Sequence, residues 1–422
     1  MQKPSILFIN RVYPPVHGAT GRMLRDLAGA FVRDGWHVTV LTAGDNAAKF
    51  QDAQGVNVHC VRVNMAQKNA LAYMLVWVKL FFAALFLKKH QLVVSKTDPP
   101  MLAYLGHLIA GKMGASHIHW CQDVYPDLFP VLRVRLPRFA YNLMKKLQLK
   151  ALLDCERVVV IGRCMARHLI NNKVPARKIS VIPNWHNPSL DTRAIKASQD
   201  AASVFGGNTE FKKTLFNDDA PKFRVLYAGN LGWAHPIQTI LGAAYYLNAD
   251  YPEIEFVFIG DGVGHERLAK ERARLNLNNI RLLPYQPEEN LRDVLESGDI
   301  HLVSLRENAC GLVVPCKAYS AMAVARPLIF LGPENSEIAR LIHDFKTGEV
   351  VPQGQARQLA KAIRHYRQNG EAWYSAHNAA AKTALHMRPE ESYNAWLERA
   401  REVVGDQFSA QNVYKKKARA AE

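Results

Sequence analysis

The chain has 422 residues, of which 49% are hydrophobic and 22% are charged. This length exceeds one hydrophobic core and predicts two or three domains, and the composition excludes an intrinsically disordered protein. Lysine and arginine outnumber aspartate and glutamate by 54 to 37, a formal net charge of +17, which favours an anionic partner such as a nucleotide diphosphate, nucleic acid or an anionic membrane surface. The six cysteines lack metal-ligand spacing and predict reduced thiols in a cytoplasmic protein without a metal site.

Strand and helix patterns alternate through the first half of the chain. An apolar strand at 5–10 is followed by a glycine-bearing loop at 11–21 and an amphipathic helix from about 21 to 34. Short apolar runs predict further strands at 37–42, 57–63, 92–95, 117–121, 157–162 and 179–184. Such alternation is typical of a doubly wound parallel sheet.

One apolar segment, residues 70–87, is about long enough to span a bilayer. Lys79 lies at its centre, where a charge costs roughly 2.5–3.5 kcal/mol on insertion scales. We therefore expect a buried or surface-embedded helix in a peripheral protein. The basic stretch at 133–153 could lie on anionic lipid, or form an ordinary exposed helix face.

The second half repeats the pattern after a polar stretch. Strands are predicted from 223 and at 255–262, 280–285, 300–305 and 327–332, with helices near 288–296 and 317–325 and on to about 403. The sequence thus predicts an N-terminal domain at 1–187, a linker with some peripheral helix at 188–221 and a second doubly wound domain at 222–385. A C-terminal helix at 386–404 is expected to pack on the first domain, and the basic tail at 405–422 to be disordered.

The turn "AGNLG" at 228–232 separates a buried strand from an apolar-periodic helix that His235 and Pro236 introduce. Such a strand–turn–helix unit aims backbone N–H groups and the positive end of a helix dipole at one point. Phosphate is the usual occupant, although a tight turn with glycines for geometry alone remains open. A second glycine turn at 260–264 gives a weaker signal of the same kind.

Two further stretches carry chemistry. Lys317 begins a helix, where the dipole disfavours a cation unless a bound diphosphate lies there; a solvated lysine is the alternative. The strand "HIHWC" leads into a loop with Asp123 and Asp127, candidate acid/base or hydroxyl-binding groups, although Asp123 could instead cap a turn.

With these motifs placed, residues 5 to 385 resemble the family 4 glycosyltransferases, and most closely bacterial members that build lipopolysaccharide, capsule or exopolysaccharide. The segments "YPPVHGATG", "HWCQDVYPD", "YAGNLGWAHPIQTIL" and "GLVVPCKAYSAMAVARPLI" resemble that family's motifs. The resemblance implies two Rossmann-like domains facing across a cleft, the GT-B fold. It also implies retaining transfer of a hexose or N-acetylhexosamine.

The resemblance also implies roles for individual residues. The catalytic residues are expected to be Asp123, Lys317 and His235. Donor-binding residues are expected to be Gly18, Asn230, Gly232, Gly260, Asp261, Gly262, Pro284, Tyr285, Pro315 and Ser320. Acceptor-side residues are expected to be Thr20, Gln122 and Asp127.

This chain departs from the family pattern at several of these positions. Ser320 stands where many relatives carry the glutamate that holds the ribose hydroxyls, and Gln122 stands where other branches carry a histidine. Cys316 replaces a serine and Ala325 a glycine. These departures weaken the ribose contact and the catalytic roles implied for the 122–127 loop.

The favoured hypothesis is a metal-independent transferase without a cofactor. It would move a sugar from a nucleotide donor, uridine in preference to guanosine, to a polyprenyl-diphosphate-linked saccharide at the inner face of the cytoplasmic membrane. A catalytically inactive membrane-surface scaffold that binds nucleotides, or a sugar-nucleotide epimerase, remains an alternative. Nucleic acid is not expected as a partner, since no recognised binding motif is present.

Overall fold

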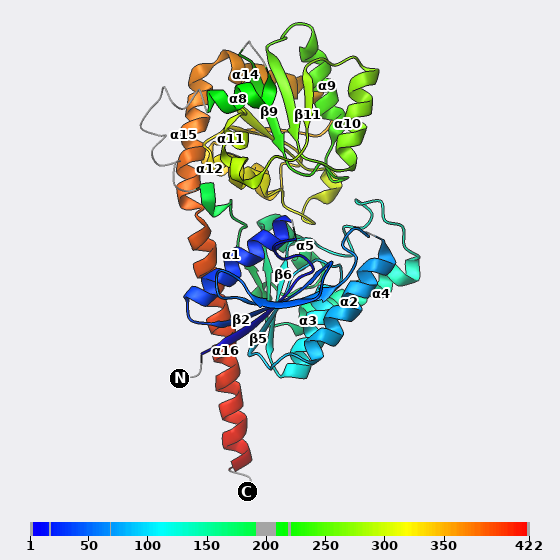
Figure 1. Ribbon diagram of the computed structural model, residues 1–422, viewed down its shortest axis with the longest axis vertical. Coiled ribbons are helices and arrows are strands. Elements are labelled where there is room, and N and C mark those ends of the chain that lie inside the picture. The colour runs from blue at the N-terminus through cyan, green and yellow to red at the C-terminus, as the bar shows by residue number, and fades with distance from the viewer. Residues whose placement is uncertain (1–2, 17, 68, 191–207, 218–220, 420–422) are drawn as a thin grey trace. The chain divides into compact units, whose positions relative to one another are not determined.

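The computed structural model describes residues 3–419 except 17, 68, 191–207 and 218–220, and it describes side chains up to residue 405 (Figure 1). The chain divides into two compact units. Unit 1 comprises Met1–Phe129, Arg135–Pro183 and Ser392–Glu422, and unit 2 comprises Pro130–Val134 and Asn184–Glu391.

Unit 1 is built on an eight-stranded sheet in the order β3-β4-β2-β1-β5-β6-β7-β8. All neighbouring strands run parallel except β3, which pairs antiparallel with β4. The strands are β1 Ser5–Ile9, β2 His37–Gly44, β3 Ala48–Gln51, β4 Asn57–Arg62, β5 Leu92–Ser95, β6 Ser116–Cys121, β7 Arg157–Val160 and β8 Ile179–Val181. The strand order reverses between β1 and β5, which is where doubly wound sheets place their ligands.

Helices and short 3-10 turns connect these strands. They are α1 Ala19–Arg33, α2 Ala70–Leu85, α3 Leu102–Met113, α4 Arg138–Asp154, α5 Arg163–Asn171 and the 3-10 turn η1 Ala176–Lys178. Helix α2 buries Ala72, Val76, Leu80 and Ala84, a spacing of four residues that places one stripe of the helix against the core. The predicted segment 70–87 is therefore a helix with one buried face. Among the described residues, no helix combines the length and apolar character needed to cross a membrane.

Unit 2 contains a six-stranded, wholly parallel sheet in the order β11-β10-β9-β12-β13-β14. The strands are β9 Phe223–Ala228, β10 Ile254–Ile259, β11 Ile280–Leu283, β12 Ile300–Ser304, β13 Leu328–Leu331 and β14 Gly348–Val351. In chain order this is the 3-2-1-4-5-6 arrangement of the Rossmann fold, with its switch point between β9 and β12.

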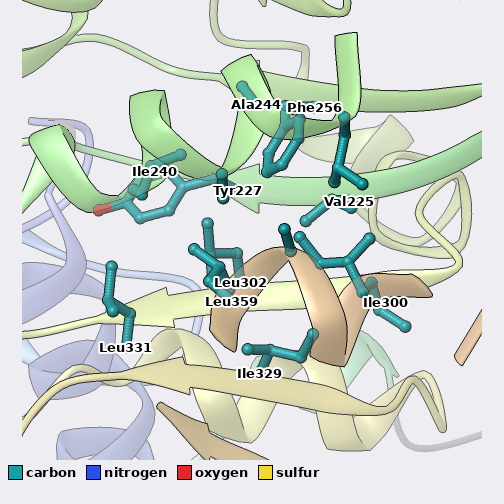
Figure 2. Packing of buried hydrophobic residues seen from close by; sticks show 14 of the residues in the cluster. Val225, Tyr227, Ile240, Ala244, Phe256, Ile300, Leu302, Ile329, Leu331 and Leu359 are labelled. Carbon is teal, nitrogen blue, oxygen red and sulfur yellow. The ribbon is translucent and has the colours of Figure 1, made fainter. Parts of the chain in front are cut away.

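The helices of unit 2 cover both faces of that sheet, as in other doubly wound folds. They are α8 Thr209–Phe216, α9 Ile237–Asn248, α10 Val263–Arg274, α11 Leu291–Glu296, α12 Lys317–Ala323, α13 Glu337–Phe345, α14 Ala356–Gln368 and α15 Gly370–His386. Short 3-10 turns are η2 Pro188–Leu190, η3 Glu288–Asn290 and η4 Glu307–Ala309. Figure 2 shows strand residues such as Val225, Phe256 and Leu302 packing with Ile240 of α9 and Leu359 of α14 in a cluster of fully buried side chains.

Helix α16 runs from Pro389 to Arg419, and from Ser392 on it belongs to unit 1. The indole of Trp396 is fully buried, with its centroid 5.0 Å from that of Trp120 on β6. The basic tail was expected to be disordered, but the helix continues through it to Arg419. The run after residue 405 contains several alanine and lysine residues, which favour helix.

The sequence prediction found every strand except β3 and β14. All four residues of β3 are exposed, so the strand has no apolar alternation to reveal it. β14 is a four-residue edge strand that starts with glycine. Both belong to sheet edges, where burial imposes the weakest pattern. In the predicted linker, η2 and α8 supply the expected peripheral helix, and 191–207 lie outside the described residues.

Candidate active site

Two loops of unit 2, following β9 and β10, are joined by backbone hydrogen bonds. Leu231 donates its N–H to the carbonyl of Asp261 at 2.8 Å, and Gly264 donates to the carbonyl of Leu231 at 2.7 Å. The side chains of Asn230 and Asp261 are exposed beside this junction. The two glycine turns that the sequence singled out, including Gly232, therefore form one surface at the carboxyl edge of the sheet.

Glycine is required in this junction for two reasons. Gly260 and Gly262 have φ angles of 146° and 116°, a region that other residues rarely adopt. A Cβ at Gly260 would lie 2.5 Å from the carbonyl oxygen of Gly229, and one at Gly262 would lie 2.3 Å from Oδ1 of Asn230. Side chains are therefore excluded at both positions, and the two loops pack closely against each other.

Lys317, at the start of α12, extends into the same surface. Its ammonium donates to the carbonyl of Asn230 at 2.8 Å and to the hydroxyl of Tyr227, and it lies 3.7 Å from the centroid of the Tyr227 ring. Tyr227 in turn donates to the Asn230 carbonyl at 3.1 Å. Burial lowers the pKa of Lys317 well below that of a free lysine. The lysine is therefore held by neutral oxygens, with no carboxylate among its described partners.

His235 is fixed by β12. Its Nδ1 lies 2.8 Å from the carbonyl oxygen of Ser304, so this nitrogen carries the proton and donates. Burial and the nearby Lys317 lower the pKa of His235 to about 3, so the ring is neutral near pH 7. Its Nε2 is then an acceptor, able to receive a hydrogen bond but not to supply positive charge.

A cavity of about 190 Å³ opens beside Lys317, between the loops that follow β9 and β11. Its lining includes Gly229, Tyr285, Glu288, Lys317 and Ser320. The ring of Tyr285 is 58% exposed. Pro284 precedes it as an exposed residue, and half-buried Pro315 precedes α12 without lining this cavity. Sequence reasoning missed Glu288 and Gln286, the latter also in the lining.

The corresponding edge of unit 1 carries acidic groups. Asp123, after β6, receives a hydrogen bond from the hydroxyl of Thr97 at 3.5 Å. Burial, together with the charge of Asp98, raises the pKa of Asp123 to about 6. Asp98 itself accepts from Nε of Arg11 at 2.8 Å. Thr97 and Asp98 follow β5 and Arg11 follows β1, so this group lies at the switch point of the sheet.

A fully buried lysine fixes the start of α1. Lys96 donates from Nζ to the carbonyl of Thr20 at 2.7 Å and lies 3.8 Å from the centroid of the Trp120 ring. Gly18 caps α1, and a Cβ there would lie 2.9 Å from Cγ1 of Val12. Lys96 also lowers the pKa of Asp123 in opposition to burial, so one cation connects the 18–20 loop with Asp123.

The other two residues expected on the acceptor side have different surroundings. Gln122 is buried. Asp127 accepts from Nζ of Lys145 at 2.9 Å, Tyr141 at 3.1 Å and His168 at 3.1 Å. Burial raises the pKa of Asp127, but these partners outweigh it and lower the pKa to about 2. Its carboxylate thus joins α4 and α5 and is already occupied.

Sequence reasoning missed Arg11, Lys96 and Asp98 of unit 1. They occupy loops that follow strands at a sheet switch point, a position that was itself predictable. Arg11 follows β1, and Lys96 and Asp98 share the loop after β5, but neither loop segment has a glycine turn beside these residues to signal a site. Their association depends on the strand order.

Both α/β units carry charged and polar groups at the carboxyl ends of their strands, which is where open α/β sheets bind their ligands. Residues 18–185 match the glycosyl transferase 4-like domain, and residues 222–369 match the glycosyl transferases group 1. The chain belongs to the glycosyltransferases composed of these two domains, as the sequence motifs predicted.

A relative described as a probable glycosyltransferase, WbjE of Pseudomonas aeruginosa, is 26% identical over 352 residues, covering 81% of this chain and 82% of that protein. Among solved structures, HepE of Anabaena in complex with UDP and glucose covers 94% of this chain and 98% of its own, with a TM-score of 0.68 at 15% identity. WaaG, a glycosyltransferase involved in lipopolysaccharide biosynthesis, covers 92% and 99%, with a TM-score of 0.66 at 12% identity. These structures confirm the predicted GT-B fold class.

Proposed function

We propose that this enzyme transfers a sugar from a UDP-sugar, with retention of configuration, to a polyprenyl-diphosphate-linked saccharide in bacterial cell-surface polysaccharide synthesis. The observation that carries the proposal is the ammonium of Lys317, held by the Tyr227 hydroxyl and the Asn230 carbonyl beside a cavity of about 190 Å³. The UDP and glucose bound by HepE and the pathway of WaaG support the choice of donor and product.

Lys317 suits a leaving diphosphate because its present partners are weak ones. Two neutral oxygens do not compensate the burial of an ammonium, which is why its pKa is lowered. An anionic diphosphate would restore the charged form and gain a charge-assisted hydrogen bond. The positive end of the α9 dipole, after His235, would add to this stabilisation.

In the proposed step, the bond between the anomeric carbon and the UDP oxygen breaks as the acceptor oxygen bonds to that carbon on the same face. The acceptor hydroxyl proton passes to the departing phosphate oxygen, so no protein base is needed. Charge that develops on the diphosphate is neutralised by Lys317 rather than by a metal ion. No cofactor is required.

The neutral His235 is assigned to the donor sugar instead of the phosphates. Its Nδ1 is committed to the Ser304 carbonyl at 2.8 Å, which leaves Nε2 as an acceptor. A sugar hydroxyl can donate a hydrogen bond to Nε2, whereas an ionised phosphate oxygen carries no proton and cannot. On the other unit, Asp123 would accept a hydroxyl of the acceptor sugar.

A peripheral membrane location is part of the proposal. Helix α2 exposes large apolar side chains opposite its buried stripe, among them Leu71 at 70%, Phe82 at 56% and, just beyond the helix, Phe86 at 87%. Lys88 and Lys89 follow Phe86 directly. Apolar anchors beside lysines suit the surface of an anionic bilayer. Co-sedimentation with phosphatidylglycerol vesicles should fall on Phe82→Ser/Phe86→Ser substitution, and unchanged binding would contradict this surface.

Calorimetric titration with UDP, GDP, dTDP and ADP tests the donor assignment. We expect UDP to bind most tightly and, because the pKa of Lys317 rises on binding, to take up protons. Proton uptake is read from the dependence of the apparent enthalpy on buffer ionisation. Tighter binding of another nucleotide would contradict the uridine donor, and uptake that survives in Lys317→Met would contradict the role of this lysine.

A further inference from the structure

Two arginines of unit 2 lie over the ring of one tryptophan, and a third is hydrogen-bonded through its backbone to the next residue of the same loop. The guanidinium carbon of Arg133 lies 4.1 Å from the centroid of the Trp233 ring, and that of Arg267 lies 5.0 Å from it. Arg306 approaches the same loop, since its backbone N–H donates to the carbonyl of Ala234 at 2.8 Å. The three residues come from the 130–134 segment, from α10 and from the loop after β12.

No acidic side chain among the described residues pairs with any of these three arginines. The Nε atom of Arg306 is buried without a hydrogen-bond partner. Burial and the charges of Arg267 and Arg133 lower the pKa of the Arg306 guanidinium, so the cations repel one another. Like charges packed together without a counter-ion cost free energy, and a bound anion would offset that cost.

The cluster adjoins the donor surface. Trp233 lies between Gly232 and His235, in the loop that follows β9. The charges of Lys317 and Arg306 both lower the pKa of His235, so this histidine lies within electrostatic range of both. Lys317 nevertheless has its own oxygen partners, Tyr227 and Asn230, and none of the three arginines shares them. The surface thus holds two separate groups of cations.

We propose that Arg133, Arg267 and Arg306 form a second anion site around Trp233, which binds the diphosphate of the lipid-linked acceptor while Lys317 binds that of the donor. Guanidinium groups present forked donors that match phosphate oxygens, and three of them suit a group with several oxygens and more than one charge. This inference rests on the proposed function, because it assumes a diphosphate-bearing acceptor.

The test is a calorimetric titration of inorganic diphosphate into protein saturated with UDP. We expect the wild type to bind diphosphate under these conditions, and Arg267→Gln and Arg306→Gln each to weaken binding about 10-fold or more, as for loss of a hydrogen bond to a charged group. Arg272→Gln, an exposed arginine on the same helix α10, is the matched control and should bind as the wild type does.

The two proposals fail in different ways. If UDP does not bind, the donor assignment is wrong, and the diphosphate titration is then run without UDP. Weaker diphosphate binding in Arg267→Gln, but not in Lys317→Met, would still support the arginine site. Diphosphate that binds only when UDP is absent, or equally to wild type and both arginine variants, overturns it.

Two further measurements distinguish the acceptor diphosphate from other anions that the arginine site could bind. A preference for UDP-glucuronate over UDP-glucose that disappears in Arg306→Gln would assign the site to a donor carboxylate and overturn the proposal. Binding of phosphatidylglycerol vesicles that disappears in the same variant, without diphosphate binding, would assign it to a lipid headgroup and overturn it as well. A raised acceptor KM with unchanged donor KM in Arg267→Gln would support it.

Discussion

The two units have nearly the same sheet and opposite chemistry at its carboxyl edge. In unit 2, the edge presents glycine backbone and the ammonium of Lys317. In unit 1, it presents the carboxylates of Asp98 and Asp123, with Arg11 paired to the former. A Rossmann-like topology thus fixes where a site lies, while the loop residues fix what it binds.

Burial acts on both edges in the same direction, toward the neutral forms. It lowers the pKa of Lys317 and raises that of Asp123 to about 6. Each group therefore gains from a ligand that favours its charged form: an anion at Lys317, and hydroxyl donors at Asp123. Unit 2 is accordingly suited to phosphates and unit 1 to sugar hydroxyls.

Removal of Lys317 should have the largest effect. We expect Lys317→Ala to lower kcat by about 100- to 1000-fold, the range seen when one preorganised transition-state donor is lost. Because the half-buried ammonium lacks a carboxylate partner among the described residues, the variant should melt no lower than the wild type. Initial rates with a lipid-linked acceptor and a melting curve measure both. Exposed Lys270→Ala on α10 is the control, and a loss below 10-fold would contradict the role.

The glycine junction should be the next most sensitive feature. We expect Gly260→Ala to destabilise the protein by about 2–3 kcal/mol, because the residue has φ 146° and its Cβ would meet the Gly229 carbonyl at 2.5 Å. At Gly232 the nearest atom would be 3.5 Å away, an ordinary contact, so Gly232→Ala should change stability by less than about 0.5 kcal/mol. Urea denaturation distinguishes the two, and equal effects would contradict the clash with the Gly229 carbonyl as the cause.

Asp123→Asn should lower kcat/KM by about 10-fold, the value of a hydrogen bond to a charged group. With a pKa near 6, wild-type activity should rise with pH through this value, and the variant should lose that rise. Stability has the opposite sign: a raised carboxyl pKa contributes stability below about pH 4 that is lost as pH rises through 6. The variant should therefore melt higher than wild type at pH 7.5. An unchanged pH–rate profile would remove Asp123 from the acceptor site.

The sequence predicted those features of the two units that are encoded in neighbouring residues of the chain. The turn at 228–232, Lys317 at a helix start and the strand–helix alternation are each visible within about fifteen residues. They gave the fold class, and they pointed to the two glycine turns and Lys317, which the structure brings together in unit 2. The strand β10, for example, has six buried residues, and all but Glu255 are apolar. Such a run can be recognised as a buried strand without knowing its neighbours in the sheet.

Features that depend on strand order were not predictable in this way. Arg11 and Asp98 are 87 positions apart and meet because β1 and β5 are neighbours in the sheet. Arg133, Arg267 and Arg306 come from three separate segments, and the sequence placed Arg133 in a basic stretch that could bind anionic lipid or form an exposed helix face. Asp127 illustrates the reverse case: its sequence position implied acceptor contact, while its partners Lys145 and His168 come from α4 and α5.

The smallest predicted effect concerns the ribose. Ser320 lacks the carboxylate expected at its position, but Glu288 lines the same cavity and already accepts from Nδ2 of Asn187 at 3.3 Å. If Glu288 holds the ribose hydroxyls, Glu288→Gln should raise the donor KM about 5-fold with little change in kcat, and it should do so less for a 2′,3′-dideoxy donor that lacks those hydroxyls. Ser320→Ala is the matched comparison. A larger rise in donor KM for Ser320→Ala than for Glu288→Gln, or an equal rise for both donors in Glu288→Gln, would assign the ribose contact elsewhere. The neighbouring Glu289 does not line the cavity, so Glu289→Gln should leave the donor KM unchanged.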